Sequence, residues 1–348
     1  MKDELKFMEV FRLNDIGVYS AMENANVCPR KSESEIKREA FKEPLFEKCF
    51  CCGKKKKLID SHTVPQFILK NLSKPFKYRT SFQIEDGLSA NHKVGLKNAG
   101  IFRMLCDSCD SGTFKEYEKS EDVLLSFDSN DSKNNCQLIL DQIALKNLYK
   151  KIYDYTYWSR YLTTLKKYAC PKKLSKMNID NHIEQLQAQK MACIYEVYRI
   201  FDTKHNNQIL YNELLDYVIP IAAQGCFCLN YKGYKFIDVD KVTYMHLALF
   251  PLKEKSRVIL FTNNYNEYYN DWIIKFDKLS VKNKLKTINE FVFKDLDDYF
   301  LDHSISENDF SFLKYDSLKD YINRKDEIEI PINYLENKFD IKLKIERN

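Results

Sequence analysis

Apolar residues recur at helical spacing through the middle of the chain. From Leu138 to Leu165 they follow one another three or four residues apart, which predicts a long helix with one buried face. Pro171 ends this pattern, because the residue before a proline is disfavoured in the α-helical region. The same spacing predicts a second helix over about residues 178–203.

Shorter apolar runs, bounded by residues such as Gly233 and Pro251, predict strands in the next part of the chain. These runs are residues 225–229, 243–250 and 257–261. Helices are predicted to resume around 280–300 and 314–324, and alternation over residues 341–345 predicts an edge strand. The pattern as a whole predicts the α+β class, because strands and helices follow one another in blocks.

Four of the eleven cysteines form two C-x-x-C pairs, Cys49 with Cys52 and Cys106 with Cys109. Two sulfurs three residues apart can reach one ion where the backbone turns tightly, and Gly53 eases the first turn. Four thiolates complete a tetrahedral zinc site and leave no position for substrate, so we predict a structural zinc ion. Two alternatives stay open. Cys51 could be one of the four zinc ligands, or the cysteines could be ordinary small core residues that bind no metal.

Positive charge is concentrated around these cysteines. Residues 46–105 hold 12 Lys and Arg against 4 Asp and Glu, whereas the whole chain carries a net charge of only +5. A basic module on a mildly acidic body is typical of a protein that contacts phosphates. The chain shows no signal peptide and no apolar run of membrane-spanning length, so we expect a cytoplasmic protein in which clustered cysteines bind metal.

These shifts in composition divide the chain into four predicted parts. They are a lead-in at 1–45, the zinc module at 46–120, a helical segment at 121–205 and an α+β domain at 206–348 that selects a target or senses a trigger.

The segment between the cysteine pairs resembles the HNH, or ββα-metal, nucleases. Leu58–Pro65 carries His62 and Pro65 at the spacing of that family, and Asp110 follows Cys109 directly. The Ser-His-x-x-Pro and C-x-x-C-Asp motifs look most like a group of uncharacterised bacterial proteins with HNH-like zinc domains. The resemblance, which covers residues 49–118, implies a small zinc-bound ββα module. The apolar pattern predicts that a helical segment and a mixed α/β C-terminal domain follow it.

The resemblance also implies an activity: a metal-dependent endonuclease that hydrolyses phosphodiester bonds in DNA, with a role in bacterial anti-phage defence or restriction. His62 would be the general base. Asp110, helped by Glu118, would hold a catalytic divalent ion, Mg²⁺ by expectation. Lys54, Lys55, Lys56, Lys57 and Arg103 would bind the nucleic acid.

Each assignment has a simpler alternative. His62 could be a buried histidine bonded to the backbone, and Asp110 could cap the helix after Cys109. Glu118 and the four lysines could be solvated side chains. Ser61 stands where the family usually has a metal-binding aspartate, which favours the alternative function: a non-catalytic zinc module that binds nucleic acid or a partner protein.

Overall fold

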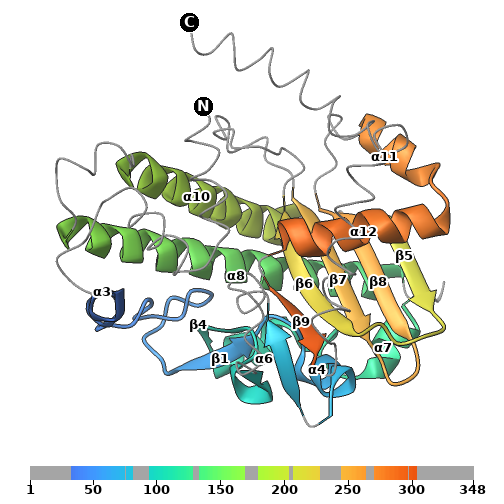
Figure 1. The fold of residues 1–348 in the computed structure, drawn as a ribbon, viewed down its shortest axis with the longest axis horizontal. Helices are drawn as coiled ribbons and strands as arrows, with labels where there is room; N and C mark the ends of the chain where they lie inside the picture. Colours follow the sequence, from blue (N-terminus) through green and yellow to red (C-terminus); the bar gives the residue numbers. More distant parts are fainter. Residues whose placement is uncertain are drawn as a thin grey trace, which may run out of the picture.

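The described residues form both helices and strands, with about twice as many residues in helices as in strands, which confirms the predicted α+β class (Figure 1). The computed structural model describes residues 33–74, 76–80, 94–127, 133–168, 179–203, 207–227, 244–263, 270–296 and 298–303. The helix expected at 314–324 and the strand expected at 341–345 lie outside these residues, as does most of the predicted lead-in.

A seven-stranded sheet forms the body of the molecule, in the order β3-β2-β9-β6-β7-β8-β5. Every neighbouring pair in it runs antiparallel. Its strands are β2 (Lys77–Thr80), β3 (Val94–Gly95), β5 (Gln208–Leu215), β6 (Ile221–Phe227), β7 (Met245–Pro251), β8 (Ser256–Thr262) and β9 (Tyr299–Asp302). Strands β7 and β8 closely match the apolar runs from which strands were predicted, whereas β6 overlaps its predicted run only at residues 225–227.

Both faces of this sheet are covered. Along β7, Met245 and Leu247 belong to the core under helices α11 (Asn270–Asp277) and α12 (Val281–Asp295). The alternate residues Ala248 and Phe250 belong to the core on the other face. Because successive side chains on a strand point to opposite faces, a strand covered on both sides reads as an uninterrupted apolar run.

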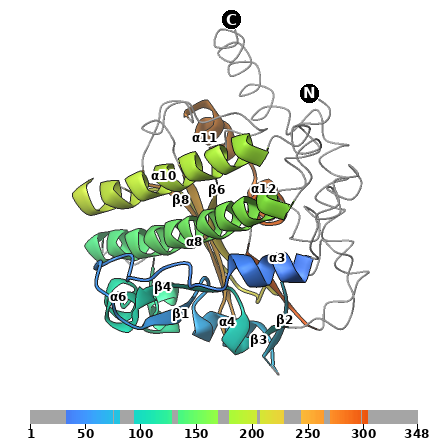
Figure 2. The same cartoon turned by 90° about the vertical axis from the view of Figure 1, so that its left-hand side faces the viewer.

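Two long helices lie side by side on that second face, and both were predicted. Helix α8 runs from Lys133 to Tyr168 and α10 from Ile179 to Thr203. The views in Figures 1 and 2 agree that α8 lies between α10 and the cysteine module. Two short helices lie elsewhere in the chain: α3 (Glu33–Ala40) packs against α8, and α7 (Glu121–Leu125) precedes α8.

The cysteine module is built on a two-stranded antiparallel sheet of β1 (Leu58–His62) and β4 (Ile101–Cys106), followed by α6 (Asp107–Thr113). The chain between the two strands forms the helix α4 (Gln66–Leu72), then β2, β3 and the 3₁₀ turn η1 (Leu96–Asn98).

The inserted segment joins the module to the C-terminal sheet. Strand β2 pairs with β9, with Arg79 opposite Leu301. The expectation of a helix as far as residue 300 was wrong at its end, because α12 stops at Asp295 and Tyr299–Asp302 forms β9 between β2 and β6. Residues 299–302 form a strand because β2 and β6 pair with them on both sides, and this pairing stabilises them more than a continued helix would.

One apolar core runs from the module into the body. Phe114, after α6, packs edge-on to Tyr149 of α8 at a centroid distance of 6.1 Å, and both belong to the same cluster as Phe250 of β7. The four-part division of the chain stays a prediction, since a shared core does not decide where a domain ends. None of the described helices is long and apolar enough to cross a lipid bilayer.

Gly100 lies where the module packs against β9, so a substitution there tests that contact. It has a φ of +59°, and a Cβ there would lie 2.1 Å from Thr63 Oγ1 and 2.5 Å from the Phe300 ring of β9. Gly100→Ala should therefore lower the free energy of unfolding by about 2–4 kcal/mol, through overpacking and a left-handed backbone. Urea denaturation measures this change.

Gly95→Ala is the matched control, since a Cβ at Gly95 meets no atom of the described residues within 4 Å. We expect a change within about 0.5 kcal/mol there. Equal stability of the two variants would contradict the packing of β9 against the module.

Candidate metal centre and the neighbouring polar cluster

The first cysteine pair lies on a tight turn held against β4. The Gly53 N–H donates to the Cys49 carbonyl at 2.8 Å, and Gly53 has a φ of +67°. The Phe50 N–H donates to the Met104 carbonyl at 2.9 Å, which fastens the turn to the strand. A glycine accommodates this backbone without strain, so the turn presents the sulfurs of Cys49 and Cys52 in one direction.

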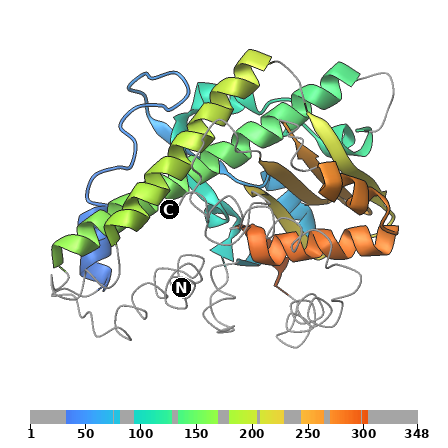
Figure 3. The ribbon, with the colours of Figure 1, turned by 90° about the horizontal axis from the view of Figure 1, so that it is seen from above.

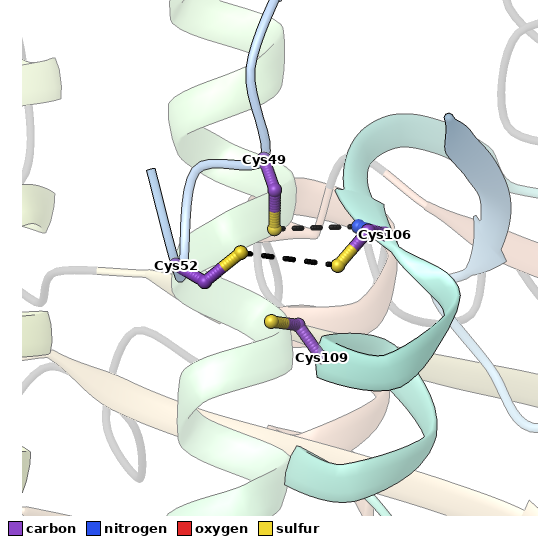
Figure 4. A group of neighbouring side chains, drawn as sticks. All are labelled: Cys49, Cys52, Cys106 and Cys109. Carbon is purple, nitrogen blue, oxygen red and sulfur yellow. Dashed lines mark hydrogen bonds between the residues drawn. The ribbon is translucent and has the colours of Figure 1, made fainter. Parts of the chain in front are cut away.

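The second pair lies where β4 becomes α6. Cys106 is the last residue of the strand and Cys109 lies in the first turn of the helix. The four Sγ atoms all lie within 4.8 Å of one another, with Cys52 and Cys106 4.0 Å apart (Figure 4). Zinc–sulfur bonds of 2.3 Å in a tetrahedron require sulfurs about 3.8 Å apart, so the donor set fits a zinc ion.

Cys51 has no part in this cluster. Its side chain is exposed, whereas Cys49 and Cys106 are buried and Cys52 and Cys109 are half-buried. This geometry favours Cys49, Cys52, Cys106 and Cys109 as the four ligands over a set that includes Cys51. It also brings these four cysteines together, whereas ordinary core cysteines would lie at separate positions.

Three of the sulfurs accept or share hydrogen bonds, and at Cys52 and Cys106 these bonds favour the thiolate form. The Cys106 N–H donates to Cys49 Sγ at 3.3 Å. A backbone hydrogen bond from Lys54 lowers the pKa of Cys52, and a hydrogen bond with Ser108 lowers the pKa of Cys106 to about 6. The thiolate is the metal-binding form, so these contacts prepare the sulfurs for a cation.

Burial works in the opposite direction at Cys109, where it raises the pKa of the thiol. Four neighbouring sulfurs cannot all carry negative charge unless a cation offsets their repulsion. Zinc would supply that cation, and its binding would release the proton that Cys109 otherwise retains.

His62, at the end of β1, is buried and held by the backbone. Its Nε2 lies 3.0 Å from the Leu96 carbonyl oxygen, which can only accept, so Nε2 carries the proton. Nδ1 then has the lone pair, and the Gln66 side-chain amide lies 3.3 Å from it. Burial lowers the pKa of His62 below its ordinary value of 6.5, so the ring is neutral at pH 7.

Asp110 contacts the strand that carries His62. The Ser61 hydroxyl donates to Asp110 Oδ1, and Ser61 is fully buried. The alternative that Asp110 caps its helix was wrong, because Cys106 occupies the N-cap and Asp110 lies inside the first turn of α6. Asp60 points the other way, as strand alternation predicts, and binds Arg103 through two hydrogen bonds.

Glu118 is not a solvated side chain. It accepts a hydrogen bond from Lys146 of α8, whose ammonium lies 4.2 Å above the ring of Phe114. Burial has the largest effect on the pKa of His62, and the charges of Lys146, Glu118 and Asp110 also act on it. Sequence reasoning missed Lys146, although a lysine within the apolar run of a helix signals a buried ion pair.

The predicted nucleic-acid contacts are at the surface. Lys54, Lys55, Lys56 and Lys57 are exposed on the segment between the cysteine turn and β1, and Lys56 donates to Ser108 Oγ at 3.1 Å. Arg103 is exposed as well, but its guanidinium already binds Asp60. A phosphate at Arg103 would therefore compete with a carboxylate, whereas the lysines face solvent.

A second metal centre does not emerge from the described residues, where only the four cysteines bring three or more ligand side chains together. Asp110 and Glu118 each have a side-chain partner, so the expected Mg²⁺ site lacks a matching donor set. The chain matches no family model, no curated protein and no solved structure.

The cysteine cluster predicts one zinc ion per chain. Cys106→Ser should abolish stoichiometric zinc and destabilise the module, because the free energy of metal binding is part of the free energy of folding. Mass spectrometry of the intact native protein measures the zinc content, and thermal unfolding measures the stability.

Cys51→Ser is the control, since Cys51 lies on the same turn with an exposed side chain. It should keep one zinc and the wild-type melting temperature. A Cys106→Ser protein with full zinc and unchanged melting would contradict the assignment.

Proposed function

We propose that this chain is an endonuclease of the HNH type, in which the zinc-bound module holds a neutral His62 as general base. The observation that carries the proposal is the hydrogen bond between His62 Nε2 and the Leu96 carbonyl. It leaves the lone pair on Nδ1, and a base needs a free lone pair at the operating pH.

In the proposed reaction, Nδ1 takes a proton from a water molecule that replaces the Gln66 amide. The hydroxide forms a bond to the phosphorus, the P–O bond to the leaving 3′ oxygen breaks, and that oxygen takes a proton from solvent. Asp110 lies in the first turn of α6 and accepts a hydrogen bond from Ser61, the residue before His62. Since the described carboxylates do not form an Mg²⁺ site, we assign no step to that ion.

The substrate we propose is DNA, whose phosphates the exposed lysines 54–57 would bind. Lysine side chains on a turn can follow a phosphate backbone without reading bases, so they would position the duplex and not select a sequence. The zinc ion would keep this turn against β4, where the Phe50 N–H bonds Met104.

A non-catalytic zinc module that binds nucleic acid or a partner protein is the second candidate. Two observations favour it: Ser61 bonds Asp110 where the family has a metal-binding aspartate, and Lys146 pairs with Glu118. Both carboxylates are then engaged within the protein. Phosphate binding by the lysines is common to the two candidates, so cleavage distinguishes them.

The cleavage test uses supercoiled, linear and single-stranded DNA, and RNA, each with Mg²⁺ or Mn²⁺. His62→Ala should lower the rate by about 10²–10⁴-fold, with zinc content and DNA affinity unchanged. Asp110→Asn keeps an acceptor for Ser61 and removes the charge, and it should also slow cleavage. His182→Ala, a half-buried histidine of α10, is the control and should cleave normally.

The pH dependence gives an independent check. The base must be neutral, and burial lowers the pKa of His62 below 6.5. The rate should therefore hold as pH falls through 6.5 and decline only at lower pH, as measured by initial rates across the range. Inactivity of the wild-type chain on all substrates would favour the non-catalytic candidate, and activity that survives His62→Ala would place the base elsewhere.

The binding test measures the DNA dissociation constant against salt concentration. Each phosphate contact contributes roughly 0.9 to the slope of log K against log salt. Changing lysines 54–57 to serine should flatten the slope by about 2–4, whereas Lys278→Ser with Lys282→Ser, exposed at α11 and α12, should leave it unchanged. Equal slopes in the two variants would show that lysines 54–57 are solvated and make no phosphate contacts.

A further inference from the structure

The outer face of α10 carries an exposed apolar patch over its C-terminal half. Four side chains on successive turns form it: Met191 at 53%, Tyr195 at 48%, Tyr198 at 66% and Phe201 at 53% exposure. Monomeric proteins rarely gather large apolar side chains in one exposed patch without an interaction to explain it. We call these four residues the α10 patch.

The α10 patch is separate from the helix face that packs against α8. That inner face consists of Ala192, Cys193, Val197 and Ile200, all buried in the core shared with α8. Met191, beside this inner face, is exposed. Figure 3 shows α10 crossing over α8, and Figures 1 and 2 place it on the side of α8 opposite to the module.

Charges border the α10 patch at both ends. Lys190 precedes it and the exposed Asp202 follows it, and neither has an ion-pair partner within the described residues. Inside the patch, the Arg199 guanidinium lies 5.6 Å from the centre of the Tyr195 ring and pairs with the buried Glu196 at 3.1 Å. Arg199 is thereby engaged within its own chain, which leaves Lys190 and Asp202 to meet a partner.

We propose that the α10 patch binds the same patch of a second copy of this chain, with the two helices antiparallel about a two-fold axis near Glu196. In this register Met191 of one copy lies level with Phe201 of the other, and Lys190 lies level with Asp202. An isologous interface repeats each contact twice, so two opposite-charge pairs flank one apolar centre.

The charges select the antiparallel direction. A parallel pair would also bring the two patches together, but it would place Lys190 beside Lys190 and Asp202 beside Asp202. Like charges at the same level repel, whereas the antiparallel pair brings opposite charges together at both ends. Sulfur–aromatic contact between Met191 and Phe201 adds to the antiparallel arrangement.

Sedimentation velocity of the full, zinc-loaded chain from about 1 to 100 µM tests the proposal. The wild-type chain should show a concentration-dependent dimer. Tyr198→Glu places a charge in the centre of the α10 patch and should abolish that dimer. Ile274→Glu is the matched control, because Ile274 is an apolar residue of α11 with a similar exposure of 52%.

Charge reversal tests the direction of the helices. Lys190→Glu or Asp202→Lys alone should weaken the dimer by about tenfold at low salt, since each replaces two attractions with two repulsions. The double variant Lys190→Glu/Asp202→Lys should recover the wild-type dissociation constant within about threefold.

A wild-type chain that stays monomeric at 100 µM would overturn the proposal, as would a dimer that Tyr198→Glu and Ile274→Glu weaken equally. A dimer that depends on Tyr198 but ignores both single reversals would overturn the antiparallel register. Circular dichroism and zinc content of each variant ensure that loss of the dimer is not loss of the fold.

Discussion

Four thiol groups held within 4.8 Å of one another are the constraint on which the module depends. Their thiolates would repel one another in the absence of a cation, and their protonated forms would fill the centre of the module with weak hydrogen-bonding groups. With zinc, the same atoms become a cross-link between the turn at Cys49 and the strand-to-helix junction at Cys106. The position of β1, and with it His62, follows from that cross-link because β1 pairs with β4 along its length.

The second constraint is the interior of α8. This helix contributes leucines and tyrosines to the core, but it also brings Lys146 to Glu118, and Lys150 to Asp154 and Asp298. Buried charges require partners with good geometry, so Lys146 with Glu118 and Lys150 with Asp298 help to hold the module and the C-terminal sheet against the helix. The module and the C-terminal sheet therefore both contact α8 and share one apolar core with it.

The sequence predicted the features that depend on local spacing. The C-x-x-C pairs, the two long helices and the strands β6, β7 and β8 each repeat a short-range rule, and each is present. The features that it did not predict depend on contacts between distant segments: β9 forms a strand because β2 and β6 flank it, and Lys146 is buried because Glu118 lies across from it. The motif around His62 predicted a histidine at the end of a strand, but the Leu96 carbonyl that sets its tautomer comes from an inserted turn whose position no local pattern encodes.

X-ray absorption at the zinc edge on the purified full-length chain tests the central claim most directly, because it reports the atoms bound to the metal. The account predicts one zinc ion with four sulfur neighbours at about 2.3 Å and no nitrogen or oxygen in the first coordination sphere. A site with mixed sulfur and nitrogen or oxygen ligands, or a folded chain that contains no zinc, would contradict it.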